Sequence, residues 1–365
     1  MKKHAIYFIP DISGFTDFVT NTEIEHSKHI IAELLEILLD NNIIHLELAE
    51  IEGDALFMYT RKLPEFKKLA AQSKLMLRKF KAHLSLYESR RICNCGACIS
   101  APNLKLKFIV HYGEIAFMRV KKIIKPYGKD VIKVHRLLKN SLQIDQYLLV
   151  TSNTVDFYEV DMQRDYPSFK KGRDRYDFGS FTYFFDDYSG INTEKKGLHM
   201  RIPSKPAGEP KLLLNEYTNL DILNTYKIIS SFEHRTKWYK LIDDLIYDEF
   251  RVNRGGTVHN CVSGSEVYKV ETLSTVAMDD AYIYAERTQD IENLSDFSFY
   301  ITLFKDSNDR TQLKLEVFFE YETEDTQVQS RIKMKLFSVW RESMARLVAL
   351  LDTIGIQQIK SIRAT

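Results

Sequence analysis

IPDISGFT at residues 9–16 and EIEGDALF at residues 50–57 are the two stretches that decide the fold of the first half of the chain. The first closes an apolar run with a Ser-Gly turn, and the second contains a Gly-Asp hairpin turn. Each carries one aspartate at its turn, Asp11 and Asp54. Turns favour Asp and Gly for backbone reasons alone, so either stretch by itself is more often structural. The two stretches together are more specific than either alone, and each supplies a carboxylate, the kind of hard oxygen ligand that divalent cations prefer.

Strand and helix patterns surround these stretches. We expect strands at residues 5–9, 46–51, 55–59, 104–112 and 146–151, and helices at residues 22–39, 64–87 and 131–140. The first six of these elements follow the order β-α-β-β-α-β, which is that of a ferredoxin-like unit. The first half is therefore predicted to be an α+β domain.

The second half has a different pattern. We expect strands at residues 211–217, 245–252, 257–262, 266–276, 282–288, 297–305 and 312–321, and helices at residues 220–232 and 328–354. The last helix has an apolar stripe along its length, which predicts a curved antiparallel sheet that packs on one long C-terminal helix. Three prolines in residues 199–210, HMRIPSKPAGEP, mark a linker. The predicted domains are residues 1–198 and 211–365.

Composition excludes several classes of protein. The chain has 365 residues, four cysteines and a net charge of +1. No apolar run approaches the roughly 20 residues of a membrane helix, and the N-terminus lacks a secretory signal pattern. The charge is too low to demand nucleic acid as a partner, and so few cysteines do not build a disulfide-stabilised secreted fold. We expect a cytoplasmic protein without a membrane span.

The two opening stretches closely resemble the metal-binding motifs of class III adenylyl and guanylyl cyclases. The resemblance extends through HYGE at residues 111–114 and YGKDVIKVHRLL at residues 127–138, and covers about residues 7–158. It implies that Asp11 and Asp54, with Ile12 beside them, bind Mg²⁺ or Mn²⁺ in a two-metal site. It also implies that a purine nucleotide lies with its phosphates at the turn residues Ser13, Gly14, Phe15 and Thr16.

This sequence departs from the cyclase pattern at the catalytic and base-reading positions. The family's transition-state arginine matches Arg136, but its asparagine position holds Ile132, which can donate no hydrogen bond. The base-reading positions hold Glu50 and Lys125. Glu50 is the residue that guanylyl cyclases carry at this position, whereas Lys125 fits neither the adenylyl nor the guanylyl cyclase pattern. A Glu50–Lys125 ion pair is therefore the alternative to base recognition as the role of these two residues. Loss of one transition-state donor typically slows an enzyme about 10²–10³-fold.

A cysteine cluster lies outside the cyclase pattern. Cys93, Cys95 and Cys98 form C-x-C-x-x-C, and three thiolates at this spacing can share one Zn²⁺. The nearest upstream candidate for a fourth ligand is His83, and a partner chain could also supply it. Reduced thiols in a loop remain the alternative.

The second half resembles the START-related helix-grip superfamily (SRPBCC), which also contains birch-pollen-allergen-like proteins. The resemblance rests on residues 219–238, on GGTVHNC at residues 255–261 and on the final amphipathic helix. It implies a cavity for an apolar or lipid-like small molecule, with Trp238, Phe299, Phe318 and Trp340 as lining residues. A solid aromatic core is the alternative. The pairing of the two modules resembles an uncharacterised bacterial two-domain family.

Two functional hypotheses follow. The first is a signalling or ligand-binding protein with a degenerate cyclase-like domain that retains metal and nucleotide binding. The second is an active cyclase that converts ATP or GTP to a cyclic nucleotide and pyrophosphate. Class III sites form between two cyclase domains, so a chain with one such domain needs a homodimer to unite its aspartates with Arg136.

Overall fold

A computed structural model of the chain describes residues 4–92, 95–177, 179–191, 205–273, 281–306 and 310–362. The chain divides into two compact units. The first comprises Met1–Ser85 and Ile99–Lys196, and the second comprises Leu86–Cys98 and Gly197–Thr365. The predicted linker at residues 199–210 belongs to the second unit, and its part before residue 205 lies outside the described residues. The mixed α+β class predicted from the sequence is confirmed.

The first unit is built on a seven-stranded sheet with the order β2-β3-β1-β4-β7-β9-β8. Its strands are β1 (His4–Ser13), β2 (Glu47–Glu52), β3 (Ala55–Thr60), β4 (Lys105–Glu114), β7 (Tyr147–Thr151), β8 (Lys170–Tyr176) and β9 (Gly179–Asp187). All neighbouring pairs are antiparallel except β4 and β7. The four strands β2-β3-β1-β4, with helices α2 (Ile24–Asp40) and α3 (Phe66–Ser89), follow the predicted βαββαβ order.

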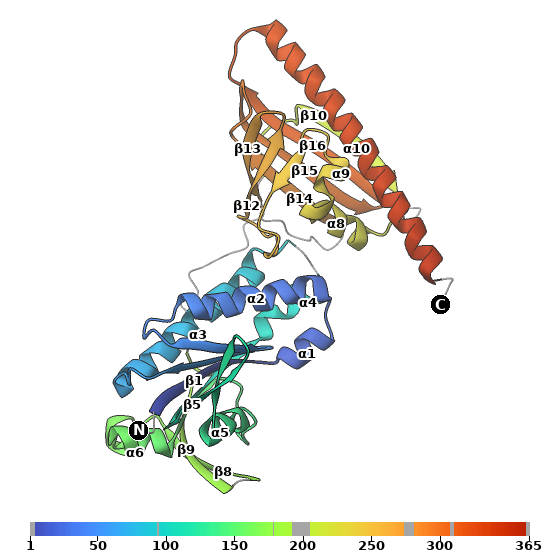
Figure 1. The fold of residues 1–365 in the computed structure, drawn as a ribbon. Helices are drawn as coiled ribbons and strands as arrows, with labels where there is room; N and C mark the ends of the chain where they lie inside the picture. The colour runs from blue at the N-terminus through green and yellow to red at the C-terminus, as the bar shows by residue number, and fades with distance from the viewer. Residues whose placement is uncertain are drawn as a thin grey trace. The chain divides into compact units, whose positions relative to one another are not determined.

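The central strand β1 is buried on both faces. Ala5, Tyr7 and Ile9 share one core cluster with Val134 of α5 (Lys129–Leu137). Because side chains alternate along a strand, the equally buried Phe8 points to the opposite face. Helices α2 and α3 lie on one side of the sheet and α5 on the other (Figure 1). The sequence of β1 is therefore a continuous apolar run rather than an alternation of apolar and polar residues.

Several elements of the first unit were not predicted. They are α1 (Phe15–Thr20), β5 (Ala116–Val120), β6 (Ile123–Tyr127), α6 (Ser152–Tyr158), α7 (Met162–Asp165), β8 and β9. Strands β5 and β6 form a separate two-stranded hairpin. All of β5 and much of β6 are exposed, so neither strand has the half-buried alternation from which strands are predicted.

The second unit has one antiparallel seven-stranded sheet with the order β10-β16-β15-β14-β13-β12-β11. Its strands are β10 (Leu212–Thr218), β11 (Asp244–Ile246), β12 (Val258–Ser263), β13 (Glu266–Thr272), β14 (Ala281–Thr288), β15 (Leu294–Lys305) and β16 (Thr311–Tyr321). Its helices are α8 (Ile222–Ser230), α9 (Arg235–Trp238) and the long α10 (Thr326–Ile362), which runs along one face of the sheet (Figure 1). A sheet with one long C-terminal helix is thus confirmed, while membership of the helix-grip superfamily stays a prediction.

One predicted strand of the second unit is much shorter than expected. The apolar pattern predicts a strand over residues 245–252, but β11 ends at Ile246. Beyond it, Asp248 accepts hydrogen bonds from the backbone N–H of Phe250 and from Nε of Arg251. These local bonds give the backbone an alternative to the sheet and turn the segment into a loop.

The core of the second unit contains a buried ion pair. Arg235 and Glu286 lie 2.7 Å apart, with their side chains 0% and 1% exposed. Tyr284 donates a hydrogen bond to Glu286 and accepts one from Arg235. Buried charges are costly unless they are paired and hydrogen-bonded, and this network meets much of that requirement.

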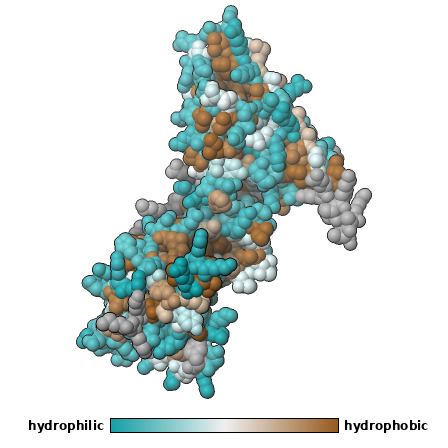
Figure 2. All heavy atoms as spheres, in the orientation of Figure 1, coloured by the Kyte–Doolittle hydropathy of each residue, from teal (hydrophilic) through white to brown (hydrophobic). Residues whose placement is uncertain are grey.

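The surface mixes polar and apolar side chains, and Figure 2 shows apolar patches on both units. The β5–β6 hairpin contributes several large exposed apolar side chains, including Val120 (56%), Ile123 (60%) and Tyr127 (61%). Among the described helices, none combines the length and apolar character that a membrane crossing needs.

Asp130 at the start of α5 ties this helix to β4. Its carboxylate accepts a hydrogen bond from the backbone N–H of Glu114 at 2.8 Å and lies 2.7 Å from Nζ of Lys133. His111 approaches the same carboxylate at 3.3 Å. A methyl group on Gly113 would lie only 2.6–2.8 Å from atoms of this side chain. The small residue in the HYGE stretch is therefore required by packing.

We expect Gly113→Ala to lower the free energy of unfolding by about 1–3 kcal/mol, because the added methyl must displace Asp130 from its partners. Gly190→Ala is the matched control, since the same methyl there meets nothing within 4 Å. That control should change stability by less than about 0.5 kcal/mol. Urea unfolding of both variants measures the difference, and equal stabilities would contradict the packing role of Gly113.

Candidate functional site

The strand register brings three charged side chains together in the first unit. In the β1–β3 pair, Asp11 lies opposite Ala55, so the preceding Asp54 lies beside it. In the β1–β4 pair, Asp11 lies opposite Lys107. The turn is fixed to β1 by a hydrogen bond from the N–H of Ile12 to the carbonyl of Asp54 at 3.2 Å. The sequence prediction paired the two aspartates but missed Lys107.

Lys107 neutralises one of the two carboxylates. Its Nζ lies 2.8 Å from Oδ2 of Asp11, with the side chains only 18% and 10% exposed. The same ammonium donates a hydrogen bond to the carbonyl of Leu138 at 3.2 Å. A lysine within an otherwise largely apolar strand is the sequence signal that could have revealed it, because a buried cation needs a carboxylate or carbonyl partner.

Asp54 holds its proton more tightly than an ordinary aspartate. Burial and then the charge of Asp11 raise the pKa of Asp54 to about 6, against the opposing effect of Lys107. A carboxyl whose pKa lies near neutral pH in a pocket is a common feature of functional sites.

These side chains lie at a pocket of about 360 Å³. Its lining includes the predicted metal residues Asp11, Ile12 and Asp54 and the predicted phosphate residues Ser13, Gly14, Phe15 and Thr16. Gly14 has φ = +87°, a backbone conformation that glycine adopts without strain, and it immediately precedes α1. The pocket also contains Asn140 and Tyr147, which sequence reasoning did not identify.

The donor atoms of this pocket suit a hard divalent cation. Two carboxylates and the Ile12 carbonyl are oxygen ligands, as Mg²⁺ and Mn²⁺ prefer. Lys107 already supplies one positive charge to the pair, so an incoming cation meets less negative charge than two free carboxylates would offer. A metal at this site would offset the charge of bound phosphates.

The other predicted site residues lie elsewhere. The guanidinium of Arg136 lies 3.4 Å from Asp177, with 53% of its side chain exposed, and does not line this pocket. Lys125 on β6 donates to Glu50 on β2 at 2.5 Å. The ion pair that competes with base reading is therefore present. Both side chains are about 40% exposed, and a surface pair of this kind contributes on the order of 0–1 kcal/mol.

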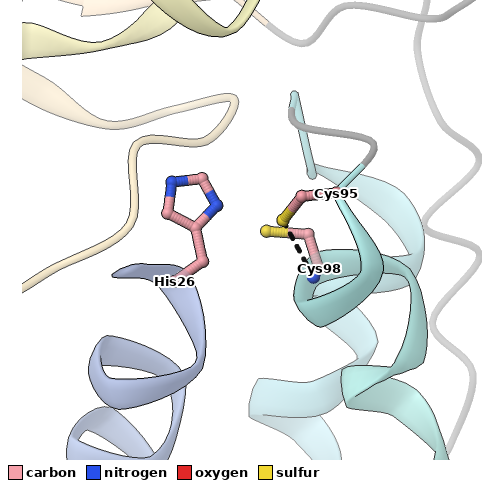
Figure 3. A group of neighbouring side chains, drawn as sticks. All are labelled: His26, Cys95 and Cys98. Carbon is pink, nitrogen blue, oxygen red and sulfur yellow. Dashed lines mark hydrogen bonds between the residues drawn. The ribbon is translucent and has the colours of Figure 1, made fainter. Parts of the chain in front are cut away.

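The cysteine cluster is described in part. Cys93 lies outside the described residues, while Cys95 is half-buried and Cys98 is buried within α4 (Gly96–Ser100). Figure 3 shows the N–H of Cys98 donating to Sγ of Cys95, at 3.5 Å. His26, also drawn there, belongs to α2 of the first unit. The suggested ligand His83 instead lies 2.7 Å from Glu33, so this histidine has a carboxylate partner.

The predicted cavity residues of the second unit are packed. Trp238, Phe299 and Trp340 share one core cluster, while Phe318 belongs to another with Ala285 and Tyr300. Phe299 borders a cavity of only about 20 Å³. That volume is close to the space one water molecule needs.

Comparisons with known proteins give three findings. A family model described as "Protein of unknown function (DUF2652)" matches residues 31–147. An uncharacterised protein of Mycobacterium tuberculosis is 33% identical over 120 residues, which cover 33% of this chain and 56% of that protein. The chain thus spans about half the length of this curated relative.

Solved structures similar to the chain include nucleotidyl cyclases. One is the catalytic core of a rhodopsin-guanylyl cyclase with converted specificity in complex with ATPalphaS (13% identity, TM-score 0.36, 50% of this chain and 95% of that chain). A bacterial light-regulated adenylyl cyclase gives 14% identity and a TM-score of 0.38, over 50% of this chain and 51% of that one. The adenylyl cyclase CyaB from P. aeruginosa has 11% sequence identity and a TM-score of 0.36, and the match covers 51% of this chain and 95% of that chain.

The raised pKa of Asp54 makes stability depend on pH. Because the folded pKa of about 6 exceeds the ordinary value of 3.8, the folded state binds the Asp54 proton more tightly than the unfolded state. The stabilisation that this bound proton gives to the folded state is complete below about pH 3.8 and is lost as pH rises through about 6. We expect Asp54→Asn to be more stable than the native protein at pH 7.5, by about 1 kcal/mol after solvent screening.

Thermal unfolding at pH 4 and pH 7.5 measures this difference, which should shrink at the lower pH. Asp156→Asn on α6 is the control, because Asp156 is exposed and lies outside the pocket. An Asp54→Asn variant that is less stable than the native protein at pH 7.5 would refute the assigned electrostatics.

The cysteine cluster predicts bound zinc. We expect near-stoichiometric zinc in protein purified without chelator and its loss in Cys95→Ser, because a hydroxyl is a much poorer zinc ligand than a thiolate. Cys261→Ala is the matched control and should retain its zinc, since Cys261 lies in β12. Elemental analysis decides the matter, and native protein free of metal would rule the zinc site out.

Proposed function

We propose that the first unit binds a purine nucleoside triphosphate together with Mg²⁺ or Mn²⁺, and that the protein acts in signalling or ligand binding. The observation that carries this proposal is the pair Asp11 and Asp54 at the polar 360 Å³ pocket. Asp11, Ile12 and Asp54 would hold the metal, which would supply charge compensation for the phosphates.

The segment from Ser13 to Thr16 supports the phosphate end of this site. It lines the same pocket as the two aspartates, and Gly14 lets the backbone turn there without a side chain in the way. Lys107 adds a fixed positive charge beside the carboxylates. The metal and Lys107 together would offset part of the negative charge of the triphosphate and the two carboxylates.

Two residues favour binding over efficient turnover. Ile132 on α5 is 56% exposed and offers no hydrogen-bond donor at the position where the cyclase family has asparagine. Arg136 on the same helix is engaged with Asp177 and lies outside the pocket. Within one copy of the chain, the aspartates therefore lack the guanidinium that would stabilise the reacting phosphate.

Cyclase activity in a homodimer is the second candidate, and a specific observation favours it. The β5–β6 hairpin exposes Val120, Ile123, Ile124 and Tyr127, each more than half exposed. Exposed apolar patches commonly mark protein–protein contacts. A second copy docked there could offer its own exposed Arg136 to the aspartate pocket, in two equivalent sites.

For the second unit we propose the binding of a small molecule with an apolar body. The aromatic cluster of Trp238, Phe299 and Trp340 supports an apolar interior. The adjoining cavity of about 20 Å³ is too small for such a ligand, so binding would require these side chains to move apart. A ligand that binds the opened core would shift that equilibrium toward it.

The test is nucleotide binding and turnover at pH 8, where Asp54 is ionised. We expect Mn²⁺-dependent binding of ATP or GTP by calorimetry, weakened at least about tenfold in Asp54→Asn, with little cyclic product. Lys107→Met should tighten Mn²⁺ binding, because it removes a competing positive charge from Asp11.

Asp156→Asn is again the control and should behave as the native protein does. Robust cyclic product that disappears in Asp54→Asn would replace the binding hypothesis with the cyclase hypothesis. Absence of metal-dependent nucleotide binding would eliminate both. Sedimentation at micromolar concentration, with Ile123→Ser as a hairpin variant, separates monomer from homodimer.

A further inference from the structure

A second polar pocket lies within the second unit, independent of the aspartate pocket. Its volume is about 270 Å³, near the lower end of the roughly 300–1,000 Å³ typical of small-molecule sites. The side chains and backbone that line it come from three segments: Arg90, Phe232, and the loop from Tyr247 to Val258. A pocket of this size has room for one small ligand, such as a planar ring system that carries a charged group.

Three arginines make this pocket positive. Among the described residues, Arg90, Arg251 and Arg254 line it together with one carboxylate, that of Asp248. Three positive charges and one negative charge leave a formal charge of +2. Arginine is the side chain that best recognises phosphate, because its planar guanidinium donates two parallel hydrogen bonds.

Two of the arginines are held in place. Arg254 donates from Nη1 to the hydroxyl of Tyr87 at 3.0 Å, and its guanidinium lies over the Tyr87 ring, 5.3 Å from the ring centroid. Arg251 donates from Nε to Asp248 at 2.8 Å. A guanidinium that is already ordered loses less conformational freedom when it binds an anion.

Arg90 is the third arginine. Its guanidinium makes no hydrogen bond or ion pair with any other residue that the structure describes. Its carbonyl accepts a hydrogen bond from the N–H of Gly255 at 2.8 Å, which fixes its backbone against the loop. The Nη1 atom of Arg90 lies 3.4 Å from the position that a Cβ on Gly256 would take, and Gly256 has φ = +86°. Gly256 therefore presents no side chain to the guanidinium at this turn.

An aromatic wall completes the pocket. Phe232 and Tyr247 both line it, and their ring centroids are 5.1 Å apart. Nucleic-acid bases stack on aromatic side chains irrespective of their identity, because every base has a π-face. Positive charge and aromatic surface in one small pocket suit a ligand that joins a phosphate to a planar ring.

We propose that this pocket binds a phosphomonoester with a planar ring, the chemistry of a nucleoside monophosphate. The phosphate lies among Arg90, Arg251 and Arg254, and the ring lies against Tyr247 and Phe232. This site needs no metal, unlike the site proposed at Asp11 and Asp54. Ligand binding in this pocket is therefore independent of ligand binding at the two aspartates.

The test is calorimetric titration of the full-length protein with GMP and with AMP in EDTA at low salt. We expect saturable binding, weakened about tenfold or more in Arg90→Gln and in Arg251→Gln, since each loses a charge-assisted hydrogen bond. Inorganic phosphate should compete. Guanosine, which lacks the phosphate, and ribose 5-phosphate, which lacks the ring, should each bind more weakly than GMP.

Arg287→Gln is the matched control, because Arg287 is an exposed arginine of the same unit that pairs with Glu271 and does not line the pocket. It should bind GMP as the native protein does, and so should Asp54→Asn. Equal affinity in the native protein and Arg90→Gln, or loss of GMP binding in Asp54→Asn, would overturn the proposal. So would the absence of saturable binding.

Discussion

The register of β1 between β3 and β4 is the constraint on which the rest of the first unit depends. It places Asp11 beside the Asp54 turn on one side and opposite Lys107 on the other. A slip of one residue would turn every side chain of β1 to the opposite face of the sheet. Asp11 would then exchange places with its apolar neighbours, and the core cluster built on Tyr7 and Ile9 would be lost with it. Core packing therefore fixes the geometry of the charged site.

Charged side chains lie in different environments in the two units. In the first, the carboxylates of Asp11 and Asp54 border an open polar pocket, and Lys107 balances them only in part. In the second, Arg235 and Glu286 are closed inside the core and bonded to each other and to Tyr284. A partly balanced site next to solvent can still accept a charged ligand, whereas a closed pair principally specifies how its surroundings pack. The arginine-rich pocket of the second unit belongs to the first type.

Much of the fold was predictable from local pattern. The helices α2 and α3 and the β2–β3 hairpin lie within a few residues of their predicted ranges, because long apolar periods and a Gly-Asp turn are strong local signals. The exposed β5–β6 hairpin and the shortened β11 were missed or misjudged. Strands without a buried face carry no periodic signal, and a loop held by Asp248 has the same apolar content as a strand.

The sequence by itself determined the paired aspartates, the Gly14 turn and the absence of a donor at Ile132, since these depend only on which residue occupies each position. The tertiary structure decided which charges meet. Lys107 joins Asp11 across a strand pair, Lys125 joins Glu50, and Arg136 points away to Asp177. The three arginines that line the second pocket come from two segments about 160 residues apart and converge only on folding. Contacts between strands and loops distant in sequence are set by packing of the whole chain, and no local pattern encodes them.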